Sequence, residues 1–177
     1  MFPTLLANVG VPMIFLMLSM MMVLLIPVIG IEYLVAWRMV PEESWGRKLG
    51  GIAYANLVST FVGWPVAWFL LLLFNLLVLG GRAYGLDSPL QAFVTVVLQA
   101  TWLVPYEEEF YWMIPTAASV LLVPFFFASV YLERWLLYPV WKKTPWKTLC
   151  RFSWRSHWAS YLFLLAAYWI LLGTWPF

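Results

Sequence analysis

Four long apolar stretches that carry very few charged residues dominate the sequence, near residues 11–37, 49–79, 113–138 and 154–174. Each can cross the hydrocarbon core of a bilayer, roughly 30 Å thick, which takes about 20 helical residues. A spanning backbone must satisfy its own hydrogen bonds, so the stretches are predicted to be helices. Only 10% of all residues are charged, whereas a soluble domain carries about 25%. The sequence therefore predicts an all-α integral membrane protein with four transmembrane helices.

A segment of intermediate character, residues 88–104, separates the second stretch from the third. It is apolar enough to enter lipid, but it contains Gln91, Gln99 and Thr101. We interpret it as an interfacial or half-buried helix. The alternative, a fifth full span, would give the two halves of the chain opposite orientations. The expected organisation is a first transmembrane hairpin at 1–79, an external connection at 80–112 and a second transmembrane hairpin at 113–177.

Basic residues concentrate in the two loops that join the helices within each hairpin. The first loop carries Arg38, Arg47 and Lys48. The second loop and the start of the following stretch carry a basic cluster, which consists of Lys142, Lys143, Lys147, Arg151 and Arg155. The positive-inside rule places both loops in the cytoplasm, and the basic cluster can also attract anionic lipid. We therefore expect a multi-pass protein of the plasma (inner) membrane with both termini on the extracytoplasmic side.

An internal repeat relates the two hairpins. A shift of 101 residues without a gap superposes Glu32 on Glu133, Trp45 on Trp146, Ser59 on Ser160 and Trp68 on Trp169. Apolar matches between membrane helices are common, whereas a glutamate in the membrane is costly and rare. Equivalent points are separated by two crossings, so the repeats are parallel. This pattern predicts a four-helix bundle of two repeated helical hairpins with pseudo-two-fold symmetry.

Polar residues recur at equivalent places in each hairpin. Glu32 and Asn56 are equally far from the first turn, as Glu133 and His157 are from the second. A hydrogen bond across each hairpin is expected, because an unpaired carboxylate in hydrocarbon costs about 2.5 to 3.5 kcal/mol. The candidate site is therefore a polar cluster of six residues, Glu32, Asn56, Ser59, Glu133, His157 and Ser160. Its role is either to fix helix packing or to bind a proton, a cation or a lipid headgroup.

Simpler roles are also open to these glutamates. Glu32 lies shortly before the first cytoplasmic charges and can reach headgroup water, and Glu133 can pair with Arg134, Arg151 or Arg155. A separate acidic run on the outer side consists of Glu107, Glu108 and Glu109. This run either docks a basic partner, binds a cation or is a solvated loop.

Several classes of function are excluded. The single Cys150 and the single His157 rule out a disulfide framework, a thiolate zinc site and a histidine cluster for iron or copper from this chain alone. No hydrolase, metalloprotease or nucleotide-binding motif occurs. A net charge of +2 does not suggest a nucleic-acid partner. We therefore expect no cofactor, no metal site within the chain and no enzymatic activity.

Three short phrases resemble a group of small prokaryotic membrane proteins. They are IPVIGIE at 26–32, ANLVST at 55–60 with Gly63-Trp64-Pro65 shortly after it, and FFASVYLE at 126–133. In these phrases the chain resembles the FraC-type filament-integrity proteins of multicellular cyanobacteria, over both hairpins but not over residues 80–111. The resemblance implies a non-enzymatic role at cell–cell septa, where such proteins help to assemble junctions that exchange small molecules. It implies no catalytic residue.

Together these features favour a structural or assembly subunit of a cell-envelope complex. With little mass outside the membrane, the chain is expected to contact membrane lipids and either other membrane proteins or further copies of itself. The first alternative is a transporter or channel subunit, in which Glu32, Glu133, Asn56 and His157 would line a path for a proton, a cation or a headgroup. The less favoured alternative is an intramembrane enzyme on a lipid substrate, kept because the polar cluster is expected near headgroup depth.

Overall fold

The computed structural model describes residues 11–78, 87–103 and 110–173, and nearly all of them are helical. The elements are β1 (Val11–Pro12), α1 (Met13–Met39), α2 (Trp45–Val58), the π-helical turn η1 (Ser59–Gly63), α3 (Trp64–Val78), α4 (Pro89–Leu98), β2 (Trp102–Leu103), α5 (Phe110–Val140) and α6 (Trp146–Gly173). The predicted all-helical class is confirmed. The two short strands, which were not predicted, pair antiparallel with Val11 opposite Leu103.

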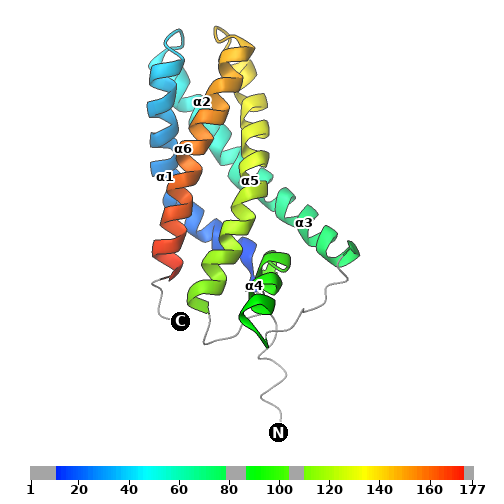
Figure 1. The fold of residues 1–177 in the computed structure, drawn as a ribbon. Coiled ribbons are helices and arrows are strands. Elements are labelled where there is room, and N and C mark those ends of the chain that lie inside the picture. The colour runs from blue at the N-terminus through cyan, green and yellow to red at the C-terminus, as the bar shows by residue number, and fades with distance from the viewer. Residues whose placement is uncertain (1–10, 79–86, 104–109, 174–177) are drawn as a thin grey trace.

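Four helices form the body of the molecule. Helix α1 packs against α2 and α6, and α5 packs against the same two helices, so the four close into a ring. The turns at 40–44 and 141–145 lie at the same end of this bundle, at the top of Figure 1. Buried residues on α1 recur every three or four positions, as at Met17, Met21 and Leu24, so one stripe of the helix faces its neighbours.

Within the described residues, three helices are long and apolar enough to cross a membrane. They are Met13–Met39, Trp45–Val78 and Tyr111–Val140, the second of which joins α2, η1 and α3 into one continuous helix. This is compatible with the predicted membrane protein. The predicted fourth span corresponds to α6, which has 28 residues but carries Lys147, Arg151 and Arg155 in its first half and is not among the three.

The second of these candidate spans contains the π-helical turn η1 in its middle part. Pro65 follows this turn and has no N–H group to donate to the preceding turn of the helix, a common reason for a local break in α-helical bonding. Beyond it, α3 leaves the bundle, as Figure 1 shows. All residues of α3 are described, and only Trp64 and Asn75 among them are buried.

The connection between the hairpins contains a short helix rather than a span. Helix α4 begins after Ser88, whose hydroxyl accepts a hydrogen bond of 3.3 Å from the Gln91 amide, and Pro89 occupies its first turn. Its 10 residues rise about 15 Å, half of a hydrocarbon core. The alternative of a fifth full span therefore does not fit α4, which packs against α5.

The two hairpin turns are fastened to each other by Glu43. This buried carboxylate accepts a hydrogen bond of 2.7 Å from the Lys143 amide and forms an ion pair of 3.0 Å with Arg47. The Trp141 indole donates to the Arg47 carbonyl at 3.2 Å. Gly51 lies beneath this indole, and a Cβ atom there would lie 2.8 Å from Trp141 Nε1. Close packing at this end of the bundle sets how the two hairpins align below it.

Candidate functional site

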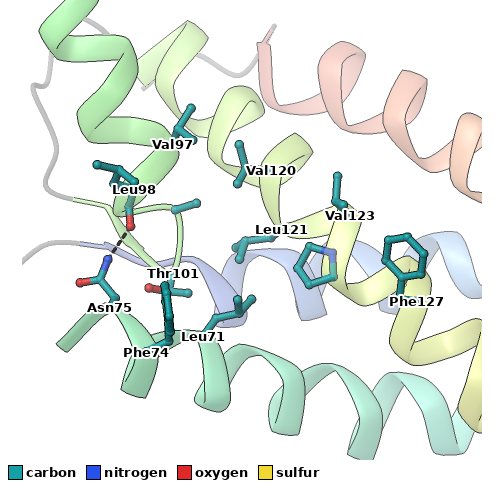
Figure 2. Close-up of a pocket in the computed structure, with 12 residues that line it drawn as sticks. Leu71, Phe74, Asn75, Val97, Leu98, Thr101, Val120, Leu121, Val123 and Phe127 are labelled. Carbon is teal, nitrogen blue, oxygen red and sulfur yellow. Dashed lines mark hydrogen bonds between the residues drawn. The ribbon is translucent and has the colours of Figure 1, made fainter. Parts of the chain in front are cut away.

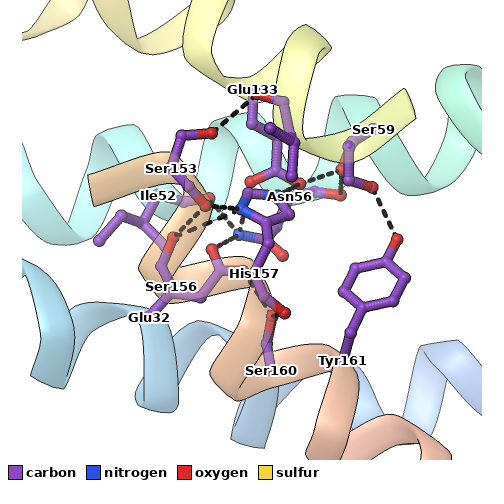
Figure 3. A network of polar contacts seen from close by, with 12 residues as sticks. Glu32, Ile52, Asn56, Ser59, Glu133, Ser153, Ser156, His157, Ser160 and Tyr161 are labelled. Carbon is purple, nitrogen blue, oxygen red and sulfur yellow. Dashed lines mark hydrogen bonds and ion pairs between the residues drawn. The ribbon is translucent and has the colours of Figure 1, made fainter. Parts of the chain in front are cut away.

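The six residues of the polar cluster lie together in the middle of the bundle, as Figure 3 shows. None of them is more than 2% exposed. Four helices and the π-helical turn supply them: Glu32 from α1, Asn56 from α2, Ser59 from η1, Glu133 from α5, and His157 and Ser160 from α6. The structure therefore gathers all six residues that the sequence singled out into one site.

Glu32 receives hydrogen bonds from both hairpins. The Asn56 amide donates to Glu32 Oε2 at 2.7 Å, which is the bond expected across the first hairpin. The Ser160 hydroxyl, from the second hairpin, donates to Glu32 Oε1 at 2.9 Å. This second bond was not predicted, because it depends on how the hairpins face each other.

Glu133 is held in a corresponding way. The Ser59 hydroxyl donates to Glu133 Oε1 at 2.5 Å, and the Asn56 amide reaches Oε2 at 3.3 Å. His157 Nε2 lies 3.4 Å from Glu133 Oε1 across the second hairpin, which is an ion-pair distance, whereas in the described part of the chain the structure records no hydrogen bond at this nitrogen of the kind expected. Asn56 thus bridges the two carboxylates, and the two predicted pairs are parts of a single site.

Backbone carbonyls one turn earlier orient the amide and the imidazole. Asn56 Nδ2 donates to the Ile52 carbonyl at 3.1 Å, and His157 Nδ1 lies 2.8 Å from the Ser153 carbonyl. Because a carbonyl oxygen only accepts, Nδ1 must carry a proton in this contact. In the neutral imidazole Nε2 then bears a lone pair, and Nε2 is the atom that faces Glu133.

The simpler roles considered for the glutamates do not fit the structure. Glu32 is 2% exposed, so it does not reach the surface of the bundle. Among the described residues, no Lys or Arg forms an ion pair with Glu32 or Glu133. Arg134 instead places its guanidinium over the Tyr131 and Trp146 rings. Both carboxylates are therefore buried without a permanent positive charge beside them.

A second polar layer, which the sequence analysis missed, borders the cluster. The Tyr161 hydroxyl lies 2.9 Å from Ser129 Oγ and accepts a hydrogen bond of 3.3 Å from the Trp64 indole. The Ser153 hydroxyl donates to the Val130 carbonyl at 2.7 Å. Ser129 lies four residues before Glu133, and Ser153 lies four residues before His157. Residues four apart share one face of a helix, so this spacing could have predicted the second polar layer.

The other predicted site residues lie elsewhere. All five side chains of the basic cluster are exposed, on the turn at 141–145 and the first half of α6. None of them contacts the polar cluster through a hydrogen bond or ion pair that the structure records. The acidic run at 107–109 lies outside the described residues.

An apolar pocket of about 380 Å³, which the sequence did not suggest, lies between α3, α4 and α5. Leu71, Phe74, Leu121 and Phe127 are among the residues that line it (Figure 2). At its edge, the Asn75 amide donates a hydrogen bond to the Leu98 carbonyl. The Trp68 indole donates to the Thr101 carbonyl at 2.8 Å, so α3 is tied to the connecting segment at two points.

Comparisons with protein families, with curated proteins and with solved structures find no significant match for this chain.

Proposed function

We propose that this chain is a non-enzymatic, multi-pass subunit of a cell-envelope complex in the plasma membrane, and that it assembles through lateral helix contacts. The observation that carries this proposal is α3, a helix that leaves its own bundle and keeps most of its surface uncovered. Phe69, Leu70 and Leu77 are 52%, 59% and 81% exposed. A helix in this position supports a contact with a helix from another protein.

The two hydrogen bonds that attach α3 to the connecting segment support a contact surface of fixed shape. Trp68 and Asn75 attach one side of α3 to the segment around α4, and these bonds leave the opposite side free. Association in lipid depends on close van der Waals packing, since lipid tails are as apolar as leucine. A helix held in one orientation loses less conformational entropy when a partner packs against it.

We infer further that α6 completes a bundle of four spans. Its 28 residues rise roughly 42 Å, which exceeds a hydrocarbon core of about 30 Å. Its basic residues lie near the turn at 141–145, where long side chains can reach the headgroups. Both basic turns lie at one end of the bundle. This placement supports a topology in which that end faces the cytoplasm and both termini lie on the extracytoplasmic side.

We infer that the two hairpins are repeats related by a pseudo-two-fold axis. Three contacts of the first hairpin have a counterpart 101 residues later in the second. The Asn56 bond to Ile52 matches the His157 contact with Ser153. The bond from Ser59 to Asn56 matches the one from Ser160 to His157, and the bond from Ser59 to Glu133 matches the one from Ser160 to Glu32.

The specific form of the proposal, a role in filament integrity at septal junctions, is carried by the resemblance to FraC-type proteins. One of its phrases, Gly63-Trp64-Pro65, spans the point where η1 ends and α3 begins. The resembling residues thus include those that direct α3 away from the bundle. A fluorescent fusion in a filamentous host is expected to concentrate at septa, and an even distribution around the cell would contradict the septal role.

Photo-crosslinking along α3 tests the assembly proposal. Benzoylphenylalanine in place of Phe69 or Leu77 is expected to give protein adducts in the native membrane. Ile26 on α1, which is 79% exposed, is the matched control and is expected to give lipid adducts. If the α3 positions give lipid adducts alone, as Ile26 does, the proposed surface is lipid-facing and the proposal fails.

The second candidate function is a transporter or channel subunit, and the buried carboxylates favour it. Glu32 and Glu133 lie in one site together with His157, a combination found in proton and ion pathways. The double variant Glu32→Gln with Glu133→Gln separates the candidates in liposomes. A transporter would lose substrate flux while its complex stayed assembled, whereas an assembly subunit shows no flux before or after the change.

A further inference from the structure

The nitrogen Nε2 of His157 has no hydrogen-bond partner among the described residues. The residue is 1% exposed, so bulk water does not reach it. The Ser153 carbonyl engages the other ring nitrogen, Nδ1, at 2.8 Å. That arrangement is typical of metal-binding histidines, in which the second ring nitrogen donates to a carbonyl or carboxylate and fixes the tautomer. In the neutral imidazole the lone pair of Nε2 faces Glu133 Oε1, which lies 3.4 Å away (Figure 3).

A divalent cation also matches the charge of the three side chains as ligands. In the forms that bind metal, two ionised carboxylates and one neutral imidazole carry a charge of about −2, and burying such charge without compensation is costly. Asn56, Ser59 and Ser160 contribute hydrogen bonds but no charge. A divalent cation among the three titratable residues would make the site neutral as a whole.

The positions of the ligand atoms fit one ion. One oxygen each from Glu32 and Glu133 and one nitrogen from His157 all lie within 4.8 Å of one another. The centre of three atoms so spaced lies within about 2.8 Å of each, and small side-chain rotations bring this to the roughly 2.0 to 2.2 Å of zinc bonds. Three protein ligands with oxygen and imidazole donors are a known set for zinc.

We propose that Glu32, Glu133 and His157 together bind one divalent transition-metal ion of the zinc class, which holds the two hairpins together. An imidazole ligand favours zinc and its neighbours over Mg²⁺ and Ca²⁺, which prefer sites made of oxygen atoms and water. This proposal departs from the expectation of no metal site within the chain. That expectation rested on the single cysteine and histidine, which exclude thiolate and multi-histidine sites but not a site in which carboxylates from two hairpins complete the set.

The surrounding hydrogen bonds suit this role. Ser59 and Ser160 each donate to a carboxylate, and each hydroxyl also lies within hydrogen-bond range of a backbone carbonyl one turn earlier, so they hold the oxygen atoms in place. Outer partners of this kind orient metal-binding carboxylates. The ion is expected to enter as the hairpins come together, because the site is buried once the bundle has formed.

Metal analysis of the purified full chain tests the inference, which does not depend on the assembly proposal. Protein produced with added zinc is expected to retain about one zinc ion per chain after extensive dialysis. Protein stripped by a chelator is expected to unfold at a lower temperature and to regain the lost stability with Zn²⁺ but not with Mg²⁺. Absence of bound metal together with no stabilisation by Zn²⁺ would overturn the inference.

Variants of the ligands provide the second measurement. His157→Gln is expected to weaken zinc binding more than about 100-fold, since losing a ligand exceeds the effect of losing an outer partner. The matched control is Glu43→Gln, which alters another buried carboxylate, remote from the site, and is expected to retain the metal. Equal zinc binding by His157→Gln and the control would contradict the inference.

Cobalt gives a readout that packing alone cannot produce. Co²⁺ added to the stripped chain is expected to show the visible absorption of a low-coordinate site with oxygen and nitrogen ligands. In His157→Cys a thiolate-to-cobalt charge-transfer band is expected in the near ultraviolet. A folded His157→Cys protein that lacks this band would exclude residue 157 as a metal ligand, whatever the stability of the other variants.

Discussion

Ser160 on α6 donates a hydrogen bond of 2.9 Å to Glu32 on α1, although the two residues are 128 positions apart. The bond runs from one hairpin to the other, and Ser59 returns it by donating to Glu133. Each hairpin thus supplies a hydrogen-bond donor to the buried carboxylate of the other hairpin. The exchange makes the interface between the hairpins specific, because a rotation of either one would leave a carboxylate without a donor.

Gly51→Ala is expected to destabilise the bundle. The added Cβ would lie 2.8 Å from Trp141 Nε1 and close to the Leu137 side chain, so the helices must shift. Overpacking of this kind costs about 1 to 3 kcal/mol. Unfolding in detergent measures the loss. Gly50→Ala, where no atom lies within 4 Å, is the control and is expected to be neutral or stabilising. Equal stability of the two variants would contradict the tight contact.

Asn56→Asp is expected to be more damaging than Asn56→Ala. The amide of Asn56 donates to both buried glutamates, and the nearly isosteric aspartate would replace this donor by a third carboxylate facing them. Alanine leaves acceptors unsatisfied, at about 1 to 3 kcal/mol, whereas the aspartate adds repulsion to that loss. The yield and unfolding temperature of the two proteins measure the order. An aspartate variant as stable as the alanine variant would show that Asn56 does not bridge the carboxylates.

Glu43→Ala is expected to separate the two hairpin turns locally. The carboxylate accepts from the Lys143 amide and pairs with Arg47, so its loss leaves that partly buried amide without this partner. The cost is about 1 to 3 kcal/mol. Hydrogen exchange should show faster exchange around Lys143. The neighbouring exposed Glu42→Ala is the control, and similar exchange in both variants would rule out a fastening role for Glu43.

Cysteine labelling is expected to place the two hairpin turns in the cytoplasm. In a chain with Cys150→Ser, cysteines introduced at the exposed residues Glu42 and Lys142 should react with an impermeant maleimide only after the cells are opened. A cysteine at Asp87, near the other end of the bundle, should react in intact cells. Labelling of Glu42→Cys and Lys142→Cys from opposite sides would contradict an even number of membrane crossings between the two turns.

The partners within each hairpin could be predicted from the sequence, because polar groups in lipid need partners at equal depth. Glu32 with Asn56, and Glu133 with His157, followed from their distances to the turns, and the structure has turns where these were placed. The bonds between hairpins could not be predicted, since they depend on helix rotation. Glu43 was also missed, because a charge in a loop is usually solvated, whereas here the second turn covers it.

The departure of α3 from the bundle could not be predicted from the sequence either. Residues 49–79 read as one uninterrupted span, and Pro65 alone does not tell a kink from a straight helix. The π-helical turn at Ser59–Gly63 directly precedes α3, the part of the helix that leaves the bundle. The Ser59 side chain of this turn donates to Glu133, a contact that depends on the position of α5.

Sharing of one polar site among four helices has a consequence for biogenesis. When the first hairpin enters the bilayer during synthesis, Glu32 has Asn56 but still lacks Ser160, which is synthesised much later. In a bilayer the early hairpin is therefore expected to be a costly intermediate with an incompletely paired carboxylate, a feature open to recognition by membrane quality control. Completion of the second hairpin is expected to remove it. The residues that specify the mature bundle are thus expected also to distinguish it from chains truncated before α6.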